Sequence, residues 1–233
     1  DAGIIIGSWG TAILWGVAFA NLVRGVELDA NHQFTGGFFS LSSPFALLGG
    51  VMLVVLFLVH GAAFIALKTK GEIHERAEGF ATKVGWAAAA LVALFVICQN
   101  VFWPATSEFG DFTVLAWVCA ILSILAIVAA PVMSGKGRDG WAFIATGLSI
   151  VTLFAGIFLK MYGNLGFAQD ESVPVLDRLN MITAASSETT LTIMAWAAVI
   201  FVPIVIGYQS WSYWVFSRRI STKNIPDDVE AVA

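Results

Sequence analysis

The chain has 233 residues, of which 58% are hydrophobic and 12% charged, and its formal net charge is −4. Soluble domains have roughly 25% charged residues, so this composition excludes a soluble fold and predicts an all-α polytopic membrane protein. The chain has no ladder of basic residues, which argues against a nucleic-acid partner. Cys98 and Cys119 lie in apolar runs without CxxC spacing, so we expect neither a disulfide framework nor a metal site.

Six apolar runs are each long enough to cross a hydrocarbon core of roughly 30 Å as a helix. In chain order they are Ala2 to Val23, Pro44 to Leu67, Val84 to Trp103, Phe112 to Met133, Trp141 to Tyr162, and Leu191 to Phe216. Between their interfacial ends they contain no Asp, Glu, Lys or Arg except Lys160, which we expect to snorkel to the membrane surface. Pro203 interrupts the sixth run, where we expect a kink. We predict six transmembrane helices in one helical domain over residues 1–233, with a tail at residues 218–233.

Basic residues are unevenly divided between the connections. The connections after the second and fourth runs, together with the C-terminal tail, contain nine: Lys68, Lys70, Arg76, Lys83, Lys136, Arg138, Arg218, Arg219 and Lys223. The alternate connections contain Arg24, Lys160 and Arg178. Because cytoplasmic loops carry an excess of Lys and Arg, we predict that the 68–83 connection and the C-terminus are cytoplasmic. The longest connection, residues 163–190, then lies on the outer face; it is acidic, and is either a partner-docking segment or a solvated loop.

His60 is the one ionisable residue well inside an apolar run, where burying a charge in lipid is expensive. Three interpretations compete: a haem or metal ligand, a member of a proton path, or a neutral imidazole hydrogen-bonded between helices. A membrane b-type haem commonly needs two axial ligands at matching depth, whereas His32 and His74 fall in expected loops on opposite sides. We favour the third interpretation, in which His60 bonds a polar group on a neighbouring helix.

Gln99 and Asn100 form the other buried polar pair, and amides of this kind either bridge helices or line a wet pocket, bridging being the commoner case. The sequence has no P-loop, no dinucleotide glycine fingerprint, no HExxH motif and no paired intramembrane carboxylates. We therefore expect no catalytic, cofactor-binding or metal-binding residue in this chain. His60, Gln99 and Asn100 remain its intramembrane polar candidates.

Three strings carry a more specific signal: GVAFANLVRGVELD, then FTGGFFSLSSPFALLGGVMLVVLFLVHGAAFIALKT, then FVPIVIGYQSWSYWVF. In this order and spacing, across essentially the whole chain, they resemble subunit II of the cytochrome bd-type quinol oxidases. Members of that family usually have about nine membrane helices, and this chain supplies six. Since the chain opens at Asp1 directly into an apolar run, we expect the N-terminal helices to be missing.

The resemblance implies a multi-pass subunit of a terminal oxidase in a bacterial plasma membrane. In that family quinol is oxidised, dioxygen is reduced to water, and protons are taken from the cytoplasm. The resemblance also implies that haems b and d belong to subunit I, and that subunit II is its haem-free partner in a heterodimer. Small accessory membrane subunits, membrane lipid and quinone are further candidate partners.

The alternative function is that of a secondary transporter or channel subunit. Such proteins typically show helices broken at the membrane midplane, with polar or charged groups converging there. Here Pro203 is the one central interruption of a run, and charges are absent from the middle of the runs. The apolar helices favour the oxidase subunit.

Overall fold

The computed structural model describes residues 2–107, 109–169, 173–174 and 177–216. Six helices in this part of the chain are long and apolar enough to cross a membrane. They are α1 (Ala2–Arg24), α2 (Pro44–Lys68), α3 (Glu72–Phe102), α4 (Thr113–Ser134), α5 (Asp139–Met161) and α6 (Glu188–Val215). The predicted all-α polytopic membrane fold is confirmed. The tail at residues 218–233 lies outside the described residues.

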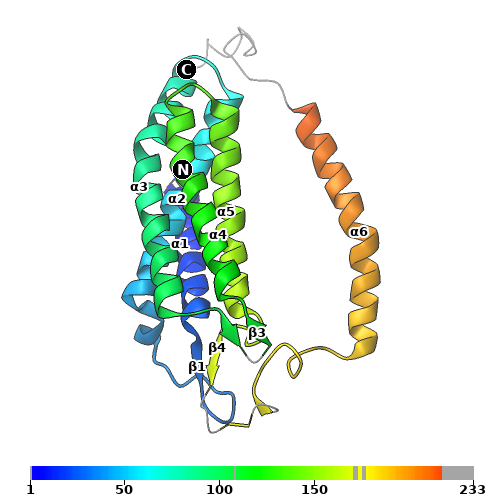
Figure 1. Ribbon diagram of the computed structural model, residues 1–233. Coiled ribbons are helices and arrows are strands. Elements are labelled where there is room, and N and C mark those ends of the chain that lie inside the picture. Colours follow the sequence, from blue (N-terminus) through cyan, green and yellow to red (C-terminus); the bar gives the residue numbers. More distant parts are fainter. Residues whose placement is uncertain (1, 108, 170–172, 175–176, 217–233) are drawn as a thin grey trace.

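Helices α1 to α5 pack side by side as a bundle (Figure 1). Its core contains Leu56 from α2, Phe95 from α3, Ile127 from α4 and Leu153 from α5. Helices α1 and α2 approach closely where glycines face each other: a Cβ on Gly16 would lie 2.3 Å from the carbonyl oxygen of Gly49. Small residues permit such contacts between membrane helices, where van der Waals packing contributes much of the association.

The connection between α2 and α3 is much shorter than the sequence suggested. We expected a loop over residues 68–83, but α3 begins at Glu72, leaving a turn at residues 69–71. Gly71 adopts φ +71°, a conformation that disfavours a side chain. Glu72 and Glu75 then occupy the first turn of α3, where negative charge interacts favourably with the helix dipole. The charges mark where the chain leaves the lipid, and the helix continues through them.

The two basic connections share one end of the bundle, because the α2–α3 turn and the α4–α5 turn both follow helices that run in the same direction (Figure 1). The C-terminal end of α6 lies at this end too. We call it the basic end. The connections after α1, α3 and α5 lie at the opposite end, as the alternating pattern of basic residues requires.

Short strands order the connections at that opposite end. Strand β1 (Val26–Leu28) pairs in parallel with β4 (Phe167–Gln169), and β2 (Thr106–Ser107) pairs antiparallel with β3 (Gly110–Asp111). A short 3-10 helix, η1 (Phe38–Ser42), precedes α2. The β1–β4 pairing ties the first part of the 163–190 connection to the segment after α1, so that part is not a free solvated loop.

Helix α6 stands apart from the five-helix bundle (Figure 1). None of its 28 residues is buried. At its C-terminal end, the Lys68 ammonium donates a hydrogen bond of 3.3 Å to the carbonyl oxygen of Phe216. Pro203 lies inside α6, and the kink expected there stays a prediction. The described chain therefore consists of a packed five-helix bundle and one apolar helix, α6, that buries none of its residues against this bundle.

Candidate functional site

One face of α5 carries buried polar side chains along its whole length. They are Asp139, Thr146, Ser149, Thr152 and Lys160. Their spacings of seven, three, three and eight residues place them on one side of an α-helix. In a membrane such groups face the bundle interior and pair there, because exposing them to lipid is expensive. These five residues, which we call the polar stripe of α5, contribute much of the buried polar surface inside the bundle.

His60 of α2 meets this stripe at Thr146. Its Nδ1 lies 2.7 Å from the Thr146 hydroxyl oxygen, and that hydroxyl in turn donates to the carbonyl of Phe143 at 2.9 Å. Since the threonine proton is used on Phe143, the imidazole Nδ1–H is the donor to the hydroxyl oxygen. The ring also stacks on Phe143, with centroids 4.7 Å apart. The expected hydrogen bond to a neighbouring helix is confirmed, while the neutral state of His60 and its lack of a ligand role stay predictions.

Gln99 and Asn100 of α3 are both buried, at 1% and 5% exposure. The Asn100 amide donates to the Val96 carbonyl of its own helix at 2.8 Å, rather than bridging to another helix. Within the described residues, neither Gln99 Oε1 nor Asn100 Oδ1 has a hydrogen-bond partner. Buried acceptors are normally satisfied, often by ordered water. Within the described residues, the Asn100 side chain therefore does not bridge to another helix.

Lys160 does not snorkel to the membrane surface, and that expectation was wrong. Its side chain is buried, with the residue 7% exposed, and its ammonium donates to the carbonyl oxygen of Trp103. Trp103 is the C-cap residue of α3, so the cation lies at the negative end of that helix dipole. Trp103 is itself held by Phe45, with ring centroids 4.5 Å apart. An inward carbonyl acceptor thus replaces the water that a snorkelling lysine would seek.

His74 belongs to α3 and not to a loop, which also corrects the sequence-based placement. Its Nδ1 lies 2.9 Å from the Ala66 carbonyl oxygen, and its Nε2 lies 3.5 Å from Glu78 Oε2. Asp139 Oδ2 of α5 is 3.9 Å from Nδ1. This small cluster joins α2, α3 and α5 at the basic end. Across the described residues, no group of three or more His, Cys, Asp and Glu side chains could hold a metal ion.

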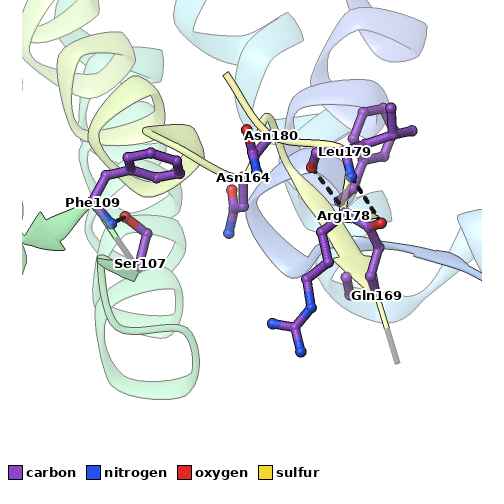
Figure 2. A pocket seen from close by; sticks show the side chains of 9 residues that line it. Ser107, Phe109, Asn164, Gln169, Arg178, Leu179 and Asn180 are labelled. Atoms are coloured by element: carbon purple, nitrogen blue, oxygen red, sulfur yellow. Dashed lines mark hydrogen bonds between the residues drawn. The ribbon is translucent and has the colours of Figure 1, made fainter. Parts of the chain in front are cut away.

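A cavity of about 300 Å³ lies among the connections at the opposite end. Figure 2 shows its polar lining, in which the Gln169 side chain bonds both the amide and the carbonyl of Leu179, at 3.0 and 2.9 Å. The Ser107 hydroxyl accepts from the Phe109 amide at 3.2 Å on the facing segment. The Arg178 Nε donates to the Val173 carbonyl. Side-chain-to-backbone bonds therefore shape this part of the 163–190 connection.

Sequence reasoning found His60, Gln99 and Asn100 but missed the rest of the polar interior. The structure brings His60 onto Thr146, and Gln99 beside Gly156, where a Cβ would lie 3.3 Å from Gln99 Nε2. The missed signal is the helical spacing of hydroxyl residues in the fifth run, which ends in Lys160. A search for polar periodicity within an apolar run would have found it.

These features define a polytopic helical membrane protein whose buried polar groups largely pair within a five-helix bundle. The chain belongs to the cytochrome bd terminal oxidase subunit II family, whose profile it matches over residues 1–216. It is 28% identical over 255 residues to cytochrome bd-I ubiquinol oxidase subunit 2 of Escherichia coli K12, covering 97% of this chain and 66% of that one. It is 30% identical over 220 residues to cytochrome bd ubiquinol oxidase subunit 2 of Bacillus subtilis 168, covering 94% and 63%.

A probable cytochrome oxidase subunit 2 of Haemophilus influenzae Rd is also 28% identical over 255 residues, with 97% of this chain and 66% of the relative covered. The chain therefore spans slightly less than two thirds of the length of these relatives. The resemblance carried by the three sequence strings is confirmed.

Proposed function

We propose that the protein is the haem-free subunit II of a cytochrome bd-type quinol:dioxygen oxidase in a bacterial plasma membrane. It pairs with and stabilises a haem-bearing subunit I in the respiratory chain. The complex oxidises quinol, reduces dioxygen to water and takes up protons from the cytoplasm. The family match over residues 1–216 carries this proposal, since relatives from two species are ubiquinol oxidase subunits by name.

The positions of the histidines support a haem-free chain, with haems b and d in subunit I. His32 lies in the connection after α1, His60 inside the bundle, and His74 at the basic end. No two of them are placed to bind one iron from opposite sides.

Helix α6 supports the pairing with another membrane subunit. It is of spanning length, yet none of its residues is buried against the described bundle. Its exposed aromatic side chains include Trp196, Phe201 and Trp211. Membrane helices associate mainly through van der Waals packing, so a free helical surface of this kind suits helices of a partner. We propose that α6, together with the little-buried α1, contributes to the contact with subunit I.

The basic end is proposed to face the cytoplasm, which gives a cytoplasmic C-terminus. The α2–α3 and α4–α5 turns share this end with the C-terminal end of α6. Lys68, Lys70, Lys136 and Arg138 lie in or beside these turns, and Arg76 and Lys83 follow in the first half of α3, which gives this end the excess of basic residues. Single cysteines at Lys70 and Ser221 test the orientation in intact cells with a membrane-impermeant reagent. Both should resist labelling from outside. Rapid labelling of Lys70→Cys would show that the orientation in the membrane is the opposite of the one proposed.

The direct test of function is purification of the native complex through a tag on this chain. Mass spectrometry of every chain should identify a haem-bearing partner, and the complex should consume oxygen when supplied with a quinol. If the chain instead purifies alone in several detergents, and membranes lacking it keep full quinol oxidase activity, the proposal fails. A transporter or channel would purify without a haem-bearing partner, and its loss would leave quinol oxidase activity unchanged.

A further inference from the structure

An apolar groove lies between α2 and α3 at the basic end. Its volume is about 480 Å³, within the range of small-molecule sites. It is lined by Phe57, Leu58, Gly61, Ala62, Ile65, Ile73, Arg76, Ala77 and Phe80. Gly61 leaves it open: a Cβ at this position would meet no atom within 4 Å. Eight apolar residues and one arginine therefore line this groove.

Arg76 pairs with Glu72, the first residue of α3, so its guanidinium lies close to the α2–α3 turn. Ile65 in the last turns of α2 and Ile73 in the first turn of α3 line the groove beside it. The side chain of Arg76 is 79% exposed and pairs with Glu72, which is 73% exposed. Exposed pairs of this kind contribute little, so the guanidinium can exchange this carboxylate for another anion. Its planar donors match a phosphate well.

We propose that this groove binds an anionic phospholipid, with one acyl chain between α2 and α3 and the phosphate on Arg76. The apolar walls from Phe57 to Ile65 suit an acyl chain, and the cation at the interfacial end suits a headgroup. Basic pockets between membrane helices on the cytoplasmic side bind anionic headgroups in this way. A quinone headgroup is neutral, so it would not replace Glu72 as the anionic partner of the guanidinium. The site is separate from the proposed role of the chain and does not depend on it.

The test uses the whole complex, reconstituted in nanodiscs containing equal amounts of phosphatidylglycerol and phosphatidylcholine, then released into mild detergent for native mass spectrometry. The unsubstituted protein should retain phosphatidylglycerol over phosphatidylcholine by about fivefold, which corresponds to about 1 kcal/mol for one arginine near the surface. R76Q should abolish this preference while lipid still binds. G61L should fill the groove and remove the retained lipid of both kinds.

Two matched variants control for general effects of charge and bulk. K136Q removes a basic residue at the same end, and G79L adds a side chain to α3 where a Cβ meets no atom within 4 Å. Both should leave lipid retention unchanged. Unchanged retention in G61L, or an unchanged preference in R76Q, overturns the proposal. Release of a bound quinone by G61L would overturn it in favour of a quinone site.

Discussion

The hydrogen bond between His60 and Thr146 joins α2 to α5, and T146V removes it with little change in side-chain shape. Thr146 is fully buried, so nothing in the solvent can replace its hydroxyl. The substitution leaves the imidazole Nδ1–H, now 2.7 Å from an oxygen, without an acceptor. The Phe143 carbonyl loses a donor too, but it lies within α5, where the helix supplies its main hydrogen bond.

The expected cost follows from these contacts. An unsatisfied buried donor costs about 1–3 kcal/mol, whereas hydrogen bonds between membrane helices average about 0.6 kcal/mol. His60 is only partly buried, so we expect T146V to lower the free energy of unfolding by about 1 kcal/mol. H60A should cost a similar amount, and H60Q, which keeps a donor and an acceptor, should cost less.

A double-mutant cycle measured by reversible unfolding in mixed micelles isolates this interaction. The coupling between H60A and T146V should be about 0.5–1.5 kcal/mol. T152V is the matched control, because the Thr152 hydroxyl bonds carbonyls of its own helix, and it should show no coupling with H60A. Additive effects of H60A and T146V would refute the bond. Loss of a haem band from an H60Q complex that still assembles would show that His60 is a haem ligand.

Three further predictions concern other contacts. Because a Cβ on Gly16 would lie 2.3 Å from a backbone oxygen of α2, G16A should destabilise the bundle by about 1–3 kcal/mol in the same unfolding assay, whereas G7A, in open space, should be neutral. K160M removes the donor to the Trp103 carbonyl and should cost about 1 kcal/mol, while K136M at an exposed site should cost nothing; equal effects would contradict the buried contact. Hydrogen bonds from Thr113 lower the pKa of the Asp111 carboxyl from its ordinary 3.8. Protection of the Thr113 amide from hydrogen exchange should therefore be full above pH 3.8 and should be lost as the pH falls through the lower pKa of the folded state. D111N should abolish this pH dependence.

The sequence predicts the helices well because length and apolar character decide them. The limits of α2 and α4 differ from prediction by at most one residue at each end. It predicts the start of α3 poorly, giving Val84 in place of Glu72, because charged residues indicate where a helix leaves the lipid and not where it begins. Glu72 and Arg76, four residues apart, in fact support the helix.

The polar interior was only partly predictable. A single histidine in an apolar run is conspicuous, and its need for a partner follows from the cost of an unsatisfied donor. The identity of that partner, Thr146, depends on how α2 and α5 pack, which composition does not specify. Lys160 was misplaced because a lysine near a helix end reaches the surface or an inward carbonyl equally well. Here the carbonyl that accepts from Lys160 belongs to Trp103 at the end of α3, and the sequence of the fifth run does not reveal it.

The central claim is that this chain is a haem-free subunit that works with a haem-bearing partner. The most direct test is the reduced-minus-oxidised absorbance spectrum of the chain produced alone, compared with that of the complex purified through it. The account predicts no haem bands for the chain alone, and bands of haems b and d for the complex. Haem bands in the isolated chain, or a native complex without haem, would contradict it.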